Sequence, residues 1–251
     1  MGSKLHNVTK FLLTVTAFLG CIVLYTAVQI PGVAPMLCPW CFGFERLEPG
    51  LYIEKTASES ARQQTEATLH QSKLAVGRYF GPLQSDPDIF VCVTQGCYLN
   101  AERRGGQTVG ISFLDWVVLL SPRANTKVAL AHELSHTELH TRLGPRMFAV
   151  PIWFDEGLAV NISDDPRYLA PPGSDTRCTV PRPKRMPLNG ATWVSATEAS
   201  NTPYAEAACL VSIWLQEQGS VNGVLKLVSD IKAGVPFSRA YDFDPDAPPH
   251  A

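Results

Sequence analysis

The sequence has little net charge and no run of basic residues. It contains 21 Lys and Arg against 23 Asp and Glu, a formal net charge of −2, and the basic residues are scattered along the 251-residue chain. A nucleic-acid-binding surface needs basic residues gathered on one face, so the composition argues against nucleic acid as a partner. The sequence also has no internal period, which excludes repeat architectures. Its 45% hydrophobic content suffices for the core of one large domain or two small ones.

Charge is missing altogether from one segment near the N-terminus. Lys4 and Lys10 are followed by residues 11–30, which contain no charged residue. About 20 apolar residues span a bilayer as a helix, so we interpret 11–30 as a transmembrane signal anchor and 1–10 as a cytoplasmic N-terminus. A cleaved signal peptide is the alternative, although no clear small-residue cleavage site follows and Pro31 lies at the exit. Both interpretations predict that the rest of the chain is exported. With a signal anchor it is a periplasmic or extracellular domain at the cell membrane, and with a cleaved signal peptide it is a secreted protein.

The seven cysteines suit an exported protein, because disulfides persist in oxidising compartments. Cys92 and Cys97 flank a short predicted turn and are a plausible local disulfide. A Cys178–Cys209 disulfide is possible but has no support from spacing. We therefore expect at least one disulfide in the exported part.

A second cysteine pair has the spacing of a redox motif. Cys38-Pro-Trp-Cys41 resembles a thioredoxin-like motif, but that chemistry needs the motif at the start of a helix within a βαβ unit. Here it lies in residues 31–50, which we interpret as a linker leaving the membrane. A structural disulfide and two unpartnered thiols are the alternatives to a redox role.

Hydrophobic periodicity predicts an α+β protein. The segment 116–121 is a nearly continuous apolar run, which indicates a strand buried on both faces. The remaining predicted elements are strands within 88–94 and 108–112 and helices over 56–80, 126–143, 151–162, 203–218 and 221–232. The Pro-rich stretch 164–187 is predicted to be a loop, and 244–251 a disordered tail.

One predicted helix carries the main chemical signal. Within 126–143, for which Asn125 is a candidate N-cap, the sequence reads His132-Glu133-Leu-Ser-His136. At 3.6 residues per turn the two histidines lie on one face, about 6 Å apart along the axis, so both imidazoles can bind one zinc ion at about 2.0–2.1 Å. Glu133 can reach a water on that ion without being a ligand. A catalytic zinc keeps three protein ligands, so a third is required.

Three residues compete for the role of third ligand. His140 continues the same helix face but lies about another 6 Å along the axis. Asp155 and Glu156 lie near the start of the next predicted helix, where a carboxylate is also favoured by the helix dipole alone. The metzincin spacing is excluded, because it needs Gly at 139 and His at 142, which are Leu139 and Arg142.

The two segments together resemble a known family. His132-Glu133-Leu-Ser-His136 followed by Trp153-Phe-Asp-Glu156-Gly-Leu-Ala is similar to the paired motifs H-E-x-x-H and W-x-x-E-G-x-A of gluzincin metallopeptidases, in particular the bacterial peptidase-MA-like group. The resemblance implies zinc held by His132, His136 and Glu156, with Glu133 as general base. The resemblance covers about 88–241. It also implies that the predicted domain 51–243 has a gluzincin-like fold, with a small mixed sheet, the metal-site helix and a mostly helical C-terminal part.

The same resemblance extends more weakly to the later helix. It implies that Tyr204 donates a hydrogen bond to the oxyanion, although an aromatic residue packing on the core is the plain alternative and Tyr168 is a second candidate. The chain departs from thermolysin-type enzymes, which have an Asp four residues after the third ligand to orient a histidine. That position is Val160 here, which leaves Asn161 or Asp164 as candidate partners.

These observations predict zinc-dependent hydrolysis of a peptide or protein substrate by a membrane-anchored, exported metallopeptidase. We expect an edge strand from 108–112 or 116–121 to bind the substrate as an added strand. A zinc-binding module without turnover is the first alternative, because the orienting groups look incomplete. A redox protein acting through Cys38 and Cys41 is the second.

Overall fold

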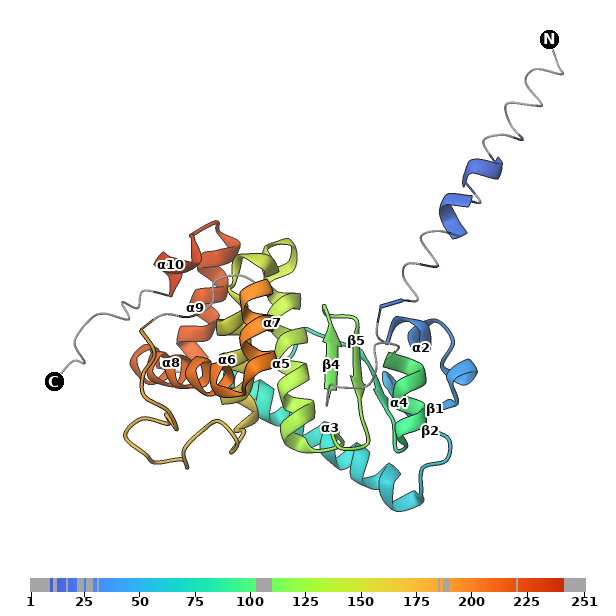
Figure 1. Ribbon diagram of the computed structural model, residues 1–251, viewed down its shortest axis with the longest axis horizontal. Coiled ribbons are helices and arrows are strands. Elements are labelled where there is room, and N and C mark those ends of the chain that lie inside the picture. The colour runs from blue at the N-terminus through green and yellow to red at the C-terminus, as the bar shows by residue number, and fades with distance from the viewer. Residues whose placement is uncertain are drawn as a thin grey trace, which may run out of the picture.

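A five-stranded mixed sheet with helices on both faces forms the centre of the protein (Figure 1). The structure is a computed structural model that describes residues 10, 13–16, 18–21, 25, 29–30, 32–102, 110–184, 186, 190–219 and 221–241. The strands are β1 (Phe44–Glu48), β2 (Leu51–Glu54), β3 (Asp88–Val91), β4 (Gly110–Phe113) and β5 (Val117–Leu120). Their order is β1-β2-β3-β5-β4; the β2–β3 and β3–β5 pairs are parallel, whereas the outer two pairs are antiparallel.

Of the three inner strands, β3 and β5 contribute buried side chains to both faces of the sheet. Successive side chains of a strand point to opposite faces, so Ile89 and Val91 join the larger hydrophobic core while Phe90 joins the smaller one. Strand β5 alternates in the same way, and all four of its residues are buried. The prediction that 116–121 contains a strand buried on both faces is therefore confirmed for Val117–Leu120, whereas Trp116 is exposed.

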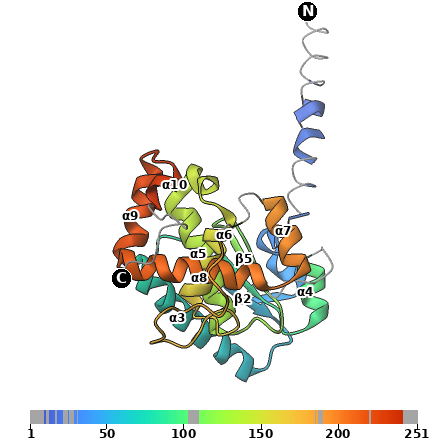
Figure 2. The same ribbon diagram turned by 60° about the vertical axis from the view of Figure 1, so that its left-hand side comes forward.

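Helices form the two outer layers and the C-terminal part. The larger core lies between one face of the sheet and α3 (Glu59–Phe80), α5 (Lys127–Leu143), α6 (Ile152–Ser163), α8 (Thr202–Gln218) and α9 (Val221–Lys232). The smaller core lies beneath α2 (Val33–Leu37), the 3-10 helix η1 (Pro39–Phe42) and α4 (Gln95–Glu102). The remaining helices are η2 (Gly144–Ala149), α7 (Gly190–Ala199) and α10 (Phe237–Ala240). Figure 2 shows α8 lying across α6, with α7 and α9 at its two ends. The prediction of an α+β protein with a small mixed sheet and a mostly helical C-terminal part is confirmed.

Three local expectations differ from the structure. Residues 31–50 are not simply a linker, because β1 lies within them and pairs with β2. The N-cap of α5 is Thr126, whose hydroxyl accepts a hydrogen bond from the backbone N–H of Ala129. Asn125 does not cap the helix; its amide donates to the hydroxyl of Thr65 at 2.7 Å. Helix α7 was not predicted.

All three cysteine pairs among the described residues are disulfides. Cys92–Cys97, expected from its short separation, is confirmed, although its second cysteine lies in the first turn of α4 rather than in a free turn. Cys178–Cys209 joins the 164–187 segment to α8. Cys38–Cys41 is closed as well, so the alternative of two unpartnered thiols is wrong for this pair.

Both ends of the chain contain predictions that the structure does not reach. Of the predicted cytoplasmic segment 1–10 and anchor 11–30, most residues lie outside the described ones, and the whole predicted tail 244–251 does so. Within the ranges described above, no helix combines the length and the apolar character needed to cross a bilayer.

Candidate metal centre

The centre is built where α5 faces the first turns of α6. His132 and His136 lie one turn apart on α5, with ring centroids 4.8 Å apart. On α6, Phe154 is buried in an aromatic cluster. Two residues further on, about 200° round the helix, Glu156 faces α5. Its Oε2 lies 3.2 Å from Nε2 of His132 and 3.7 Å from Nε2 of His136.

These three side chains lie close enough together to hold one metal ion. One ligand atom from each of them lies within 4.8 Å of the others. Two ligand atoms at about 2.0 Å from a tetrahedral zinc are about 3.3 Å apart, close to both distances from the Glu156 carboxylate. The side chains of His132 and Glu156 are 18% and 17% exposed, so a bound ion would still be reached by solvent and substrate. The structure thus brings together the two histidines and the carboxylate that the sequence predicted as ligands.

Asp155 contacts two histidines and is not part of the group of three candidate ligands. Its Oδ1 accepts a hydrogen bond from Nδ1 of His136 at 2.7 Å, and its Oδ2 lies 2.9 Å from Nε2 of His140. Because Asp155 binds Nδ1 of His136, Nε2 of that ring faces Glu156. The second oxygen of Asp155 binds His140, which lies outside the ligand group. A carboxylate that fixes a ligating imidazole in this way is a common support for metal sites. Asn161 and Asp164, the candidate partners from the sequence, bind backbone carbonyls and an arginine instead.

Charge couples Asp155 tightly to His136. Burial alone would raise the pKa of the Asp155 carboxyl, but the charge of His136 and the hydrogen bonds from both imidazoles lower it well below its usual value. Burial likewise disfavours protonated His136, yet the Asp155 carboxylate, with Glu156 and Glu133 behind it, raises the pKa of His136 to about 10. The site therefore attracts positive charge at Nε2 of His136, and a metal cation would compete there with a proton.

Glu133 lies between the centre and the edge of the sheet. It is buried, next to His132 on α5. A Cβ atom added to Gly110, the first residue of β4, would lie only 2.9 Å from Oε1 of Glu133. The backbone of β4 therefore passes directly against the Glu133 carboxylate. Of the two strands expected to offer a free edge, β4 is at the end of the sheet, whereas β5 is paired on both sides; the expectation for 116–121 is wrong.

Close packing of α6 on α8 brings Tyr204 to the same region. A Cβ atom on Gly157 would lie 2.5 Å from the carbonyl oxygen of Ala207, so glycine is required for the two helices to approach this closely. Burial, and then the nearby charge of Glu156, raise the pKa of Tyr204. Its hydroxyl therefore keeps its proton and can act as a donor. Tyr168, the second candidate, stacks on Tyr204 with ring centroids 5.4 Å apart.

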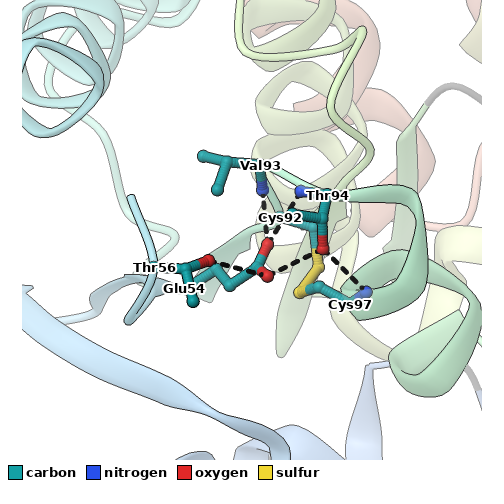
Figure 3. Close-up of a disulfide and its surroundings, with 6 residues drawn as sticks. All are labelled: Glu54, Thr56, Cys92, Val93, Thr94 and Cys97. Carbon is teal, nitrogen blue, oxygen red and sulfur yellow. Dashed lines mark hydrogen bonds between the residues drawn. A yellow bond between two sulfur atoms is a disulfide. The ribbon is translucent and has the colours of Figure 1, made fainter. Parts of the chain in front are cut away.

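A second group with metal-like spacing has another explanation. Glu54, Cys92 and Cys97 lie close together, but the two sulfur atoms are bonded to each other (Figure 3). The Glu54 carboxylate accepts hydrogen bonds from the backbone N–H groups of Val93 and Thr94 and from the hydroxyls of Thr94 and Thr56. Since disulfide sulfurs are not thiolate ligands and the carboxylate is satisfied, this cluster joins β2 to the start of α4 and holds no metal.

Comparison with protein-family models, with curated proteins and with solved structures finds no match to this chain. Its function is therefore argued from the local chemistry of the α5–α6 centre. Sequence reasoning identified the ligand candidates there, but it missed the role of Asp155. The sequence did contain a signal for this role, because Asp155 directly precedes Glu156. Adjacent residues on a helix point about 100° apart, so a search for residues on the same helix face does not pair Asp155 with the site of Glu156.

Proposed function

We propose that the protein is a zinc-dependent metallopeptidase of the gluzincin type. In this proposal His132, His136 and Glu156 hold the metal and Glu133 is the general base. The observation that carries the proposal is the convergence of two imidazole nitrogens and one carboxylate oxygen within 4.8 Å, in a partly exposed position. Two imidazoles and a carboxylate, with one position left for water, are a ligand set typical of catalytic zinc.

The chemistry follows from the groups around the ligands. A zinc ion bound there would polarise the substrate carbonyl and lower the pKa of a water molecule beside it. Glu133 takes the proton from the attacking water and delivers it to the leaving amine. Tyr204 donates its O–H to the carbonyl oxygen as negative charge develops on it. Asp155 keeps Nδ1 of His136 protonated, so that Nε2 is the free ligand atom.

Strand β4 offers a place for the substrate backbone. It is the end strand of the sheet, and its first residue lies against Glu133. A peptide added alongside β4 would extend the sheet by backbone hydrogen bonds and would run past the general base. The three disulfides favour an oxidising, exported location, in keeping with the anchor proposed for 11–30.

The alternatives have less support. The first alternative, zinc binding without turnover, arose because the sequence showed no carboxylate to orient a histidine ligand. The hydrogen bond between His136 and Asp155 supplies a candidate for that carboxylate and so weakens the alternative. A redox role for Cys38–Cys41 needs a helix within a βαβ unit, whereas this pair is closed around the short 3-10 helix η1, directly before the outer strand β1.

The experiment is a comparison of zinc content and hydrolysis. The full chain is purified in detergent and its zinc is measured by mass spectrometry, beside cleavage of a peptide library. We expect Glu133→Gln to keep close to one zinc per chain and to lose hydrolysis, because the base is gone but no ligand is. Glu156→Ala should lose the metal itself. Full activity of the Glu133→Gln protein would contradict the assignment of Glu133, and undiminished zinc in Glu156→Ala would contradict the ligand set.

A further inference from the structure

An arginine lies beside the aromatic pair that borders the centre. The guanidinium carbon of Arg167 is 5.1 Å from the centroid of the Tyr168 ring, and Tyr168 in turn stacks on Tyr204. The side chain of Arg167 is 59% exposed. A positively charged group is thus open to solvent next to a site that contains the acidic side chains of Glu133 and Glu156.

Arg167 is held in place by one buried carboxylate. The side chain of Asp165 is only 1% exposed. It accepts hydrogen bonds from Nε of Arg167 at 3.0 Å, from Nη2 at 2.5 Å and from the backbone N–H at 3.0 Å. A guanidinium has five N–H donors, and these contacts use one side of the fork. Within the part of the chain that the structure describes, Nη1 makes no hydrogen bond, so its donors remain for a ligand.

The loop that carries Arg167 is fixed to the helix that carries Tyr204. The Cys178–Cys209 disulfide ties the loop to α8. Leu169 forms a β-bridge with Cys178, and the hydroxyl of Thr179 donates to the carbonyl of Tyr168 at 3.0 Å. The position of the guanidinium relative to α8 is therefore determined by covalent and hydrogen-bonded contacts rather than by a free loop.

The same groups share one electrostatic environment. Burial raises the pKa of both Tyr168 and Tyr204, the charge of Glu156 raises it further, and the charge of Arg167 opposes the rise in both. Arg167 therefore lies within electrostatic reach of the tyrosines that border Glu156. A substrate held at the centre would pass within reach of a pre-oriented guanidinium, the group best suited to a carboxylate.

We propose that Arg167 is a specificity-determining residue that binds a carboxylate of the peptide substrate close to the scissile bond. The carboxylate belongs either to an Asp or Glu side chain or to the C-terminus of the peptide. This inference rests on the proposed peptidase function, and it adds the class of substrate: peptides that carry a negative charge near the cleaved bond.

The test uses the full chain loaded with zinc and matched peptides. A single Glu or Gln is placed at each position within three residues of the cleaved bond, and each peptide is made with a free and with an amidated C-terminus. We expect kcat/KM of the natural protein to be about tenfold higher for the Glu member at one position, or for the free acid, because a charge-assisted hydrogen bond is gained. The first result identifies a side-chain carboxylate and the second a C-terminal one.

Two variants separate Arg167 from the general charge of its loop. Arg167→Gln should reduce the Glu/Gln or acid/amide ratio to about one; because the ratio is internal to each protein, a general loss of activity cancels. Arg177→Gln removes the same charge from the same loop, where Arg177 is paired with Asp164, and should keep the natural ratio. The preference should also weaken with added salt, because Arg167 is exposed.

The outcomes distinguish the subsite from the peptidase proposal. If the natural protein cleaves charged and neutral peptides equally well, or if Arg167→Gln keeps the preference, the subsite is overturned while peptidase activity stands. If no peptide is cleaved, the peptidase proposal fails, and binding of the same peptides to the zinc-loaded protein is measured by fluorescence anisotropy. Tighter binding of the charged peptide that is lost in Arg167→Gln supports the carboxylate subsite, and equal binding overturns it.

Discussion

Replacing Asp155 by asparagine tests the support of the metal centre while leaving every proposed ligand in place. Asp155 contacts His136 at 2.7 Å and His140 at 2.9 Å, and its side chain is only 14% exposed. Asparagine has nearly the same shape but no charge, and it can accept through only one atom. The substitution therefore weakens the hold on His136 without opening a cavity.

The magnitude follows from these contacts. Loss of a carboxylate that orients a ligating histidine typically lowers metal affinity by about 10–100-fold, which corresponds to about 1.4–2.7 kcal/mol. A charge-assisted hydrogen bond contributes about 1.5–3 kcal/mol. Asparagine can still accept one uncharged hydrogen bond, so the expected loss of hydrogen-bond energy agrees with the expected loss of zinc affinity. We expect the zinc dissociation constant of Asp155→Asn to rise by that factor.

The assay is competition for zinc with a chromophoric chelator at constant pH. The control is Asp164→Asn, which removes a carboxylate from the end of the same helix, where it pairs with Arg177 away from the histidines. The control should bind zinc as the natural protein does. Equal zinc affinity of Asp155→Asn and the natural protein, or an equal loss in both variants, would refute the role given to Asp155.

Three further predictions concern the framework around the site. Gly157→Ala should lower the free energy of unfolding by about 1–3 kcal/mol in urea denaturation, because a Cβ atom there would overlap the α8 backbone. The control is Gly77→Ala in α3, where a Cβ atom meets nothing within 4 Å; it should be neutral or stabilising by up to about 1 kcal/mol. A loss of stability in Gly77→Ala equal to that in Gly157→Ala would contradict the packing argument. Burial raises the pKa of Glu54, but the hydrogen bonds from Thr94 and its neighbours outweigh it and hold the pKa below 4.5, so its stabilisation is present above about pH 4.5 and is lost as the pH falls through the lowered pKa. Chemical denaturation between pH 5 and 2 should therefore show a smaller loss for Glu54→Gln than for the natural protein, and parallel pH profiles would exclude the effect. Opening the Cys178–Cys209 disulfide with serine at both positions should cost about 3–4 kcal/mol, since 31 residues separate the two cysteines, and thermal unfolding unchanged by the double substitution would show that the pair contributes nothing.

The fold class and the helix that carries His132 and His136 could be predicted because both depend on local patterns. The apolar run of 116–121 indicates a strand buried on both faces whatever its partners are, and β5 is such a strand. His132 and His136 share a face of α5 because helical geometry alone places them there. The Cys92–Cys97 disulfide followed from a short separation along the chain.

The expectations that failed depended on which strands pair, through a short hairpin for β1 and β2 and through the strand order of the sheet for β5. Residues 31–50 contain few long apolar runs, yet β1 forms there because β2 supplies its hydrogen-bonding partner. The sequence allowed both 108–112 and 116–121 to be an edge strand, and only the strand order decided that β5 is internal. Such choices depend on which strands pair across loops, which periodicity does not encode.

The sequence by itself determined which residues we propose for the metal site: two histidines one helical turn apart, the glutamate between them, and an adjacent pair of carboxylates further along. Only the tertiary structure decided how that pair is divided, with Glu156 turned toward the imidazole nitrogens and Asp155 holding His136 and His140 from the side. It also placed Arg167 beside Tyr168 and Tyr204. The physical reason is that spacing fixes directions within one helix, whereas the angle and distance between helices depend on how closely their surfaces pack, as Gly157 allows between α6 and α8.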